Sequence, residues 1–327
     1  MHALSEQQVK TFLSIFPEAK RDEPLAPHTS LKIGGPAQLF FEAKNAEDLI
    51  GAIETAKAQN VPWYVLGGGS NVLVSDDGYK GLIIMNADRT YTVRERTVSA
   101  TGGALTTLVA KAAADAGLTG FEWGATVPGT IGGAIFGNAG CYGGEMKDLV
   151  VSVDVYNHET AKRVALPKAE CKFAYRDSAF KRKPWIILKT LLALAPSDKA
   201  RVQAKVQELL DKRKASQPAG EFSAGCMFKN FEYLEDSALD ILKKQGDSIP
   251  EDMLKNRKIA AGWLVDKLGL KGTAVGAAKV SEAHGNFIVN TGGARAQDVL
   301  QLTSMVKMKI RDELGIMLED EVQLVGF

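Results

Sequence analysis

Apolar residues recur at helical spacing in six segments of this chain. We predict helices over residues 5–16, 45–59, 105–116, 197–214, 259–268 and 297–314. Residues at the ends of these segments support the assignment. Ser5, Asn45 and Ser197 are suitable N-caps, and Gly117 and Gly315 follow two of the helices. Most of these helices are expected to bury one apolar face against a core.

Runs of β-branched and aromatic residues predict strands between the helices. The expected strands cover residues 38–43, 61–66, 72–75, 82–85, 90–100, 150–156, 162–166, 185–195, 273–277, 286–290 and 321–325. The turn residues 157–160 between two of them indicate a β-hairpin. Because strands and helices mix without regular strand–helix–strand alternation, the pattern favours the α+β fold class over a doubly wound sheet.

The segment Gly124–Gly144 follows neither spacing. It is crowded with glycine and lacks charge. A flexible linker would contain more serine and other polar residues, and each glycine would weaken a helix by about 1 kcal/mol. We therefore expect neither a linker nor a helix here. We expect a backbone that approaches a large, flat or phosphorylated ligand closely.

A second glycine cluster, Gly67–Asn71, lies between two predicted strands. It departs from the dinucleotide fingerprint GxGxxG, because Val72 stands where the third glycine belongs and a strand follows. The phosphate loop GxxxxGK[ST] does not occur in the sequence. Two interpretations stay open from the residues alone: a nest of backbone N–H groups that holds a pyrophosphate, or a glycine-rich turn without a ligand.

Composition narrows the class of protein. The chain has 327 residues, 45% of them hydrophobic, and its 40 basic and 39 acidic residues nearly cancel. Two or three domains are expected, and the balanced charge argues against nucleic acid or an anionic membrane as a partner. Cys141, Cys171 and Cys226 form no CxxC motif, so we expect no metal site and a reducing compartment. Without a signal-peptide pattern or a long apolar run, a cytoplasmic protein is expected.

Taken together, the two glycine clusters resemble the FAD-binding fold of the vanillyl-alcohol-oxidase (PCMH) type. Within that superfamily the chain resembles the UDP-N-acetylenolpyruvoylglucosamine reductase family, in the shorter subtype without a tyrosine-bearing lid insertion. The resemblance covers nearly the whole chain beyond about residue 24. Its motifs, which match in order and spacing, are Thr29–Pro36, Gly67–Leu73, Val127–Gly133, Asn138–Gly143, Ala174–Ser178, Ser223–Asn230, Gly269–Gly272 and Leu318–Gly326.

The resemblance implies non-covalently bound FAD, with NADPH as co-substrate. The residues that it places at the cofactor are Leu66, Gly67, Gly68, Gly69, Ser70, Asn71, Val127, Pro128, Gly129, Gly132, Gly133, Asn138, Ala139 and Gly140. A monomer is expected. The implied parts of the chain are an N-terminal helix and lead-in (1–24), a PCMH-type FAD-binding domain (25–214, with subdomains of about 25–85 and 86–214), and a substrate-binding domain (215–327) whose last strand (318–327) returns to the active site.

The implied reaction reduces the enolpyruvyl ether of a UDP-N-acetylglucosamine derivative to UDP-N-acetylmuramate, in peptidoglycan precursor synthesis. Carried over by position, Arg176, Cys226 and Glu321 form the catalytic trio. Arg176 would stabilise an enolate-like charge, Glu321 would bind the substrate carboxylate or orient Arg176, and Cys226 would supply the final proton. The implied substrate contacts are Tyr175, Arg176, Lys229, Asn230 and His284.

Outside the resemblance these residues have ordinary interpretations. Arg176 would pair with Asp177 at the surface, Cys226 would be a small buried residue, and Glu321 would open an exposed strand. His284 would be a surface histidine. Their joint match to one family favours the catalytic interpretation.

The chain departs from the family pattern at Cys226, where the family has serine. A thiol, with a reference pKa of about 8.5, is a stronger acid than an aliphatic hydroxyl, so we expect retained function. Phe231 also stands where the family often has proline. Two rival hypotheses remain: another FAD-dependent oxidase or dehydrogenase of the same fold, and a flavin-binding homologue without turnover.

Overall fold

The chain is divided between two units, each built from segments that lie far apart in the sequence. The computed structural model describes residues 3–218, 220–244 and 248–327. Unit 1 comprises residues 1–23, 36–69 and 79–215, and unit 2 comprises residues 24–35, 70–78 and 216–327. Residues 25–35 and 70–78, which the resemblance places in the FAD-binding domain, thus belong to the unit with the C-terminal residues. The domain bounds implied by the resemblance stay a prediction.

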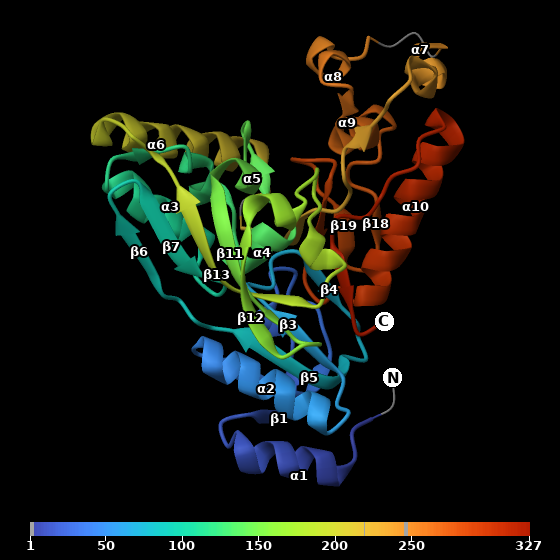
Figure 1. Cartoon of the computed structure of the whole chain (residues 1–327). Coiled ribbons are helices and arrows are strands. Elements are labelled where there is room, and N and C mark those ends of the chain that lie inside the picture. The colour runs from blue at the N-terminus through green and yellow to red at the C-terminus, as the bar shows by residue number, and fades with distance from the viewer. Residues whose placement is uncertain (1–2, 219, 245–247) are drawn as a thin grey trace. The chain divides into compact units, whose positions relative to one another are not determined.

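The first part of unit 1 combines a four-stranded sheet with two helices (Figure 1, blue). In spatial order its strands are β1 (Lys20–Pro24), β2 (Pro36–Ala43), β5 (Tyr79–Asn86) and β3 (Trp63–Leu66), of which the last three are parallel. The helices are α1 (Glu6–Ile15) and α2 (Ala46–Ala58). Both predicted N-caps are confirmed, because Ser5 forms a capping box with Gln8 and the Asn45 side chain accepts from the Asp48 N–H. Phe12 and Leu49 of these helices pack in one core with Leu82 of β5.

The second part of unit 1 is a five-stranded antiparallel sheet (Figure 1, teal to yellow). In spatial order its strands are β12 (Lys162–Pro167), β11 (Val150–Asn157), β13 (Trp185–Ala193), β7 (Thr97–Thr101) and β6 (Tyr91–Arg94). The predicted hairpin between β11 and β12 is confirmed. The single strand predicted over 90–100 is wrong. The chain reverses between β6 and β7, where Glu95 adopts a left-handed φ of 49°.

Helices and short strands complete unit 1. They are α3 (Thr106–Asp115), β8 (Leu118–Thr119), α4 (Ile131–Phe136), β9 (Gly140–Cys141), β10 (Gly144–Glu145), α5 (Met146–Leu149), β14 (Ala195–Pro196) and α6 (Lys199–Ser216). The N-cap predicted at Ser197 is wrong by one residue. The residue that caps the helix is Asp198, whose side chain accepts the Arg201 N–H at 2.8 Å. The Ser197 N–H instead donates to the Gly117 carbonyl, so Ser197 extends the pairing of β8 with β14.

Helix α4 contradicts the prediction that Gly124–Gly144 contains no helix. Two glycines lie inside it, and they are tolerated because tertiary contacts outweigh their low propensity. The Thr130 side chain caps it by accepting the Gly133 N–H, and Ile131 and Ile135 are fully buried. A Cβ on Gly132 would lie 2.8 Å from the Gly102 carbonyl oxygen, so the helix packs on this backbone only through a glycine.

Unit 2 has its own antiparallel sheet and core (Figure 1, orange and red). In spatial order the strands are β15 (Phe222–Cys226), β20 (Phe287–Asn290), β19 (Ala278–Val280) and β18 (Ala274–Val275). Its other elements are β16 (Phe231–Glu232), α7 (Asp240–Lys244), α8 (Glu251–Lys255), β17 (Lys258–Ile259), α9 (Ala261–Lys267) and α10 (Ala296–Leu314). The predicted end of α10 is confirmed, since Gly315 adopts a φ of 69°. The strand predicted over 273–277 is a hairpin instead, because Gly276 turns the chain with a φ of 54°.

Segment 70–78 belongs to unit 2 through its backbone and one carboxylate. Strand β4 (Val72–Val74) runs parallel to the last strand, β21 (Gln323–Val325). The Asp76 carboxylate accepts the N–H groups of Ala296 at 2.8 Å and Gln297 at 3.1 Å, where α10 begins. A negative side chain at this end of a helix also complements the helix dipole. The residues after the glycine cluster are therefore fastened within unit 2.

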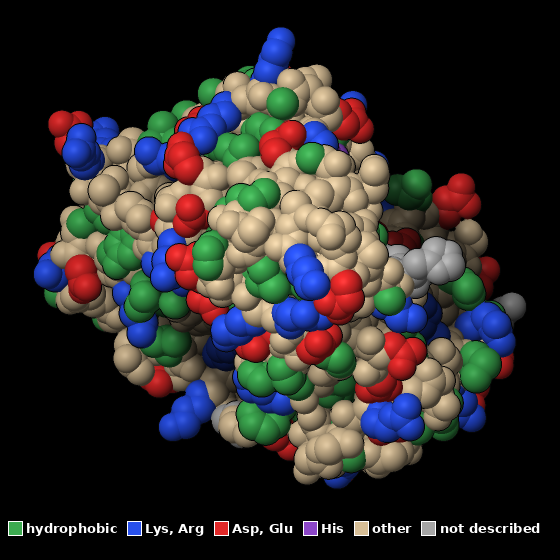
Figure 2. Space-filling view, turned by 90° about the horizontal axis from the view of Figure 1, so that it is seen from below, with side chains coloured by type: hydrophobic (Ala, Val, Ile, Leu, Met, Phe, Trp, Pro, Cys, Tyr) green, Lys and Arg blue, Asp and Glu red, His purple; other side chains and the backbone are tan. Residues whose placement is uncertain are grey.

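Charged side chains of both signs are interspersed on the face seen in Figure 2, in keeping with the balanced composition. No large region of a single sign is visible there. Within residues 3–218, 220–244 and 248–327, no helix has the length and apolar character needed to cross a bilayer.

Candidate active site

In unit 1, two glycine segments that contain predicted site residues contact each other: Gly67–Gly68 and Gly129–Thr130. Strand β3 ends at the buried Leu66 and leads into Gly67 and Gly68. A Cβ on Gly68 would lie 2.6 Å from the Gly129 Cα, and a Cβ on Gly67 would lie 2.7 Å from the Thr130 Oγ1. The two segments therefore touch backbone to backbone, and any side chain on Gly68 would push them apart.

This contact leaves hydrogen-bond donors available. In the described part of the chain, the N–H groups of Gly67, Gly68 and Gly69 donate to no backbone carbonyl. Gly69 and Gly129 adopt φ values of 61° and 100°, which orient peptide N–H groups in ways that other residues avoid. Adjacent N–H groups of this kind form a nest for anions, so the segment fits a pyrophosphate-bearing cofactor.

The remaining predicted cofactor residues of unit 1 lie along the same stretch. Val127 and Pro128 follow the 3₁₀ turn Glu122–Thr126, and Gly132 and Gly133 lie in α4. Asn138, Ala139 and Gly140 connect α4 to the β9–β10 hairpin. The structure adds a packing reason for Gly132, because it contacts the Gly102 backbone.

Arg176 lies at the tip of a tight turn. Ala174 and Asp177 exchange backbone hydrogen bonds of 3.0 and 3.2 Å, and Tyr175 and Arg176 form the loop between them. Arg176 adopts a left-handed φ of 51°, a strained conformation for a residue with a side chain. Its guanidinium donates to the Gly140 carbonyl at 2.8 Å and lies 5.3 Å from the Tyr175 ring.

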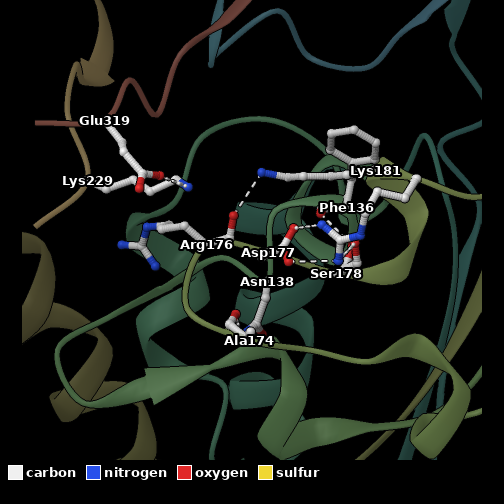
Figure 3. Close-up of polar contacts among 10 residues, drawn as sticks. Phe136, Asn138, Ala174, Arg176, Asp177, Ser178, Lys181, Lys229 and Glu319 are labelled. Carbon is white, nitrogen blue, oxygen red and sulfur yellow. Dashed lines mark hydrogen bonds and ion pairs between the residues drawn. The ribbon is translucent and has the colours of Figure 1, made fainter. Parts of the chain in front are cut away.

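The neighbours of Arg176 have partners that hold this turn (Figure 3). Both Asp177 carboxylate oxygens accept from the Arg182 guanidinium, at 2.9 and 2.8 Å. This hydrogen-bonded pair lowers the pKa of Asp177 below its usual value. The Lys181 ammonium donates to the Arg176 carbonyl at 2.8 Å. Asp177 thus has a cationic partner in Arg182, which weakens the interpretation of Arg176 as an ordinary surface pair with Asp177.

Within unit 2, the structure brings Cys226 and Glu321 into one short stretch, although 95 positions separate them in the sequence. Cys226 ends β15 opposite Phe287, after an irregularity in the strand register. The Glu321 N–H donates to the Met227 carbonyl at 2.8 Å, and Phe228 pairs antiparallel with Asp320. Segments 226–229 and 319–321 therefore lie side by side.

Asn71 joins the same stretch. Its side-chain amide donates to the Glu321 carbonyl at 3.1 Å, and its own carbonyl accepts the Gln323 N–H at 3.0 Å. The end of the glycine cluster, Ser70 and Asn71, is thereby tied to the segment that holds Glu321.

The predicted substrate contacts of unit 2 lie beside this stretch. Lys229 forms an ion pair with Glu319 at 2.8 Å, and the Asn230 Oδ1 accepts the Ala261 N–H at 3.1 Å. The His284 Nδ1 accepts the Asn286 N–H at 3.2 Å. Burial, with a smaller contribution from Lys271, lowers the pKa of His284, so its imidazole is neutral at pH 7. Lys229, Asn230 and His284 thus each have structural partners in addition to their predicted role.

Asn286, which no sequence motif indicates as a site residue, supports the Cys226 segment. The side chain is buried, accepts the Phe228 N–H at 2.9 Å and donates to the Phe228 carbonyl at 2.8 Å. Its own carbonyl accepts the Met227 N–H at 2.8 Å. No spacing in the sequence signals this contact, because the partners are 58 residues apart and the pattern around Asn286 indicates only a strand.

Replacing Asn286 by leucine is expected to lower the free energy of unfolding by about 2–4 kcal/mol. Both polar groups of the Phe228 peptide would stay buried without their partner, and each such group costs about 1–3 kcal/mol. Urea denaturation followed by circular dichroism measures the effect. Asn256→Ala, at an exposed position of the same unit, is the matched control and should change stability by less than about 0.5 kcal/mol. Equal stabilities of the two variants would contradict the support role.

Two family profiles match this chain. The profile of the UDP-N-acetylenolpyruvoylglucosamine reductase C-terminal domain matches residues 217–325, and that of an FAD-binding domain matches residues 37–165.

Whole chains are similar as well. The UDP-N-acetylenolpyruvoylglucosamine reductase of Caldanaerobacter subterraneus subsp. tengcongensis is 36% identical over 306 residues, which is 93% of each chain. That of Lachnoclostridium phytofermentans is 37% identical over 311 residues, covering 93% of this chain and 92% of the relative. The crystal structure of UDP-N-acetylenolpyruvylglucosamine reductase from Thermus caldophilus matches with a TM-score of 0.73 and 33% identity, over 94% of this chain and 98% of that one.

Proposed function

This chain belongs to the UDP-N-acetylenolpyruvoylglucosamine reductase family, and we propose that it reduces UDP-N-acetylglucosamine enolpyruvate to UDP-N-acetylmuramate. It is an oxidoreductase and flavoprotein of peptidoglycan precursor synthesis, and its cofactor is FAD. The α+β class predicted from the sequence agrees with the structural match.

When bound, FAD would supply hydride-transfer chemistry between NADPH and the enolpyruvyl group. We assign the pyrophosphate of the cofactor to the glycine contact of unit 1. Its support is the set of N–H groups of Gly67, Gly68 and Gly69, which have no backbone acceptor among the described residues, beside a backbone too close for a Cβ. The other residues assigned to the cofactor are Leu66, Ser70, Asn71, Val127, Pro128, Gly129, Gly132, Gly133, Ala139 and Gly140.

Arg176 is assigned to the developing negative charge. Hydride addition to the terminal carbon of the enol ether places charge next to the substrate carboxylate, where a guanidinium lowers the energy of the transition state. The left-handed turn that presents Arg176 is the kind of strained backbone that occurs at functional sites. Glu321 is assigned to the substrate carboxylate or to the orientation of Arg176.

Cys226 is assigned as the general acid that delivers the last proton to the carbon next to the carboxylate. The antiparallel contact between segments 226–229 and 319–321 carries this proposal, because it brings together two of the three residues named by the family pattern. We further assign Tyr175, Lys229, Asn230 and His284 to the sugar nucleotide. A cytoplasmic monomer with NADPH as co-substrate completes the proposal.

Anaerobic titration tests the function. Addition of NADPH is expected to bleach the yellow protein, and the enolpyruvyl sugar nucleotide is expected to restore the colour without oxygen. An oxidase of the same fold would regain its colour only with oxygen, and a flavin-binding protein without turnover would not be bleached by NADPH. Either of these two results would overturn the proposed reaction.

A further inference from the structure

The Arg176 turn needs support from outside, because it opposes its own backbone preference. Arg176 holds a φ of 51°, and two backbone hydrogen bonds between Ala174 and Asp177 close the loop. A residue with a Cβ stays in this region only when surrounding contacts determine it. The position of the guanidinium therefore depends on what holds the base of the turn.

Asn138 contacts that base directly. Its side chain is fully buried, and its amide nitrogen donates to the Ala174 carbonyl at 2.8 Å and to the Glu145 carboxylate at 2.9 Å. Its amide oxygen accepts the Lys147 N–H at 2.9 Å. Figure 3 shows Asn138 beside Ala174 below the turn. One side chain thus connects the end of α4, the β9–β10 hairpin and the Arg176 turn.

The hydrogen-bond partners of Asn138 leave its side chain no donor for a cofactor. Two oxygens face its amide nitrogen and one N–H faces its amide oxygen, which fixes the orientation of the amide. Both N–H donors of the side chain are used inside the protein. No side-chain donor remains for a cofactor, although the sequence resemblance placed Asn138 among the cofactor residues.

Arg176 also contacts the backbone two residues after Asn138. The Arg176 guanidinium donates to the carbonyl of Gly140, in β9. Asn138 therefore contacts both the backbone of the Arg176 turn, at Ala174, and the β9–β10 hairpin to which the Arg176 guanidinium donates. We infer that Asn138 is a positioning residue for Arg176 rather than a cofactor ligand, which rests on the proposed role of Arg176.

Asn138→Gly tests this inference without straining the backbone. Asn138 adopts a φ of 43°, which glycine reaches as easily, so the change removes only the side chain. Asn60→Gly is the matched control, since Asn60 is exposed and holds a similar φ of 53°. Asn138→Asp is a second variant. It keeps the acceptor for the Lys147 N–H and loses both donors.

Four readouts separate the two roles. Hydrogen exchange at residues 174–178 of the apoprotein should accelerate by about tenfold or more in Asn138→Gly and stay unchanged in Asn60→Gly. The dissociation constant of FAD should stay within about twofold of the wild type. Re-oxidation of the reduced protein by substrate should slow by roughly 10–100-fold, because small misplacements of a catalytic group have effects of this size. Reduction by NADPH should be unaffected.

A double variant shows whether the effect passes through Arg176. In an Arg176→Ala background, Asn138→Gly should slow re-oxidation by less than about twofold more, since coupled residues are not additive. Weaker FAD binding with unchanged exchange at 174–178 would overturn the inference and return Asn138 to the cofactor. Normal re-oxidation in Arg176→Ala would overturn the proposed role of Arg176 instead, while the exchange data would still decide whether Asn138 holds the turn.

Discussion

Replacing Arg176 by alanine is expected to slow re-oxidation of the reduced protein by the enolpyruvyl sugar nucleotide by roughly a thousandfold. Removing one electrostatic donor from a developing oxyanion costs about 10²–10³ in rate, and a full positive charge should lie at the upper end of this range. Reduction by NADPH should keep its rate, because the enolate charge does not arise in that half-reaction. Anaerobic stopped-flow absorbance measures the two steps separately.

Two further variants sharpen this prediction. Arg176→Lys keeps the charge but loses the planar group that donates to the Gly140 carbonyl, so an intermediate rate is expected. Arg163→Ala breaks an exposed ion pair with Glu47 in the same unit and should leave both rates unchanged. Re-oxidation of Arg176→Ala at the rate of the wild type would remove Arg176 from the reaction.

Replacing Cys226 by alanine is expected to slow the same re-oxidation step by roughly 10²–10⁴-fold, the usual contribution of a positioned general acid. Serine at this position, the residue of the family pattern, should retain turnover, because a hydroxyl of similar size can also deliver a proton. Bleaching by NADPH should be normal in both variants. The comparison of alanine with serine separates proton delivery from simple packing of the β15 segment.

Cys141 provides the control for the thiol. Its sulfur lies 3.3 Å from the Thr126 hydroxyl, and burial raises the pKa of the Cys141 thiol, which keeps it protonated. Cys141→Ser preserves the polar contact and should leave both half-reactions unchanged. If Cys226→Ala re-oxidised as fast as Cys226→Ser, the proton would have to come from another group.

Most helices were predictable because their signals are local. The capping box of Ser5 and Gln8, the Asn45 cap and the left-handed Gly315 all act within a few residues of the chain. The hairpins at Glu95 and Gly276 were not predicted, because a turn made by a single residue leaves little trace in the composition of the run. In each, one left-handed residue reverses a run whose composition still favours a continuous strand.

Helix α4 shows where local propensity fails. Gly132 and Gly133 argue against a helix, yet the Thr130 cap, the buried Ile131 and the close packing on Gly102 stabilise one. These contributions are a cap and tertiary contacts rather than intrinsic propensities, so the helix propensities of the segment do not reveal them.

Some features of the candidate site were determined by the sequence, and others only by the tertiary structure. By residue type, order and spacing, the sequence alone determined the α+β class, the two glycine clusters, and the family pattern that names Arg176, Cys226 and Glu321. Tertiary structure alone decided that Glu321 lies against the Cys226 segment, that Asn286 holds this segment and that Asn138 holds the Arg176 turn. The physical reason is that these contacts are hydrogen bonds between residues 36, 58 and 94 positions apart, which leave no periodic trace in the chain.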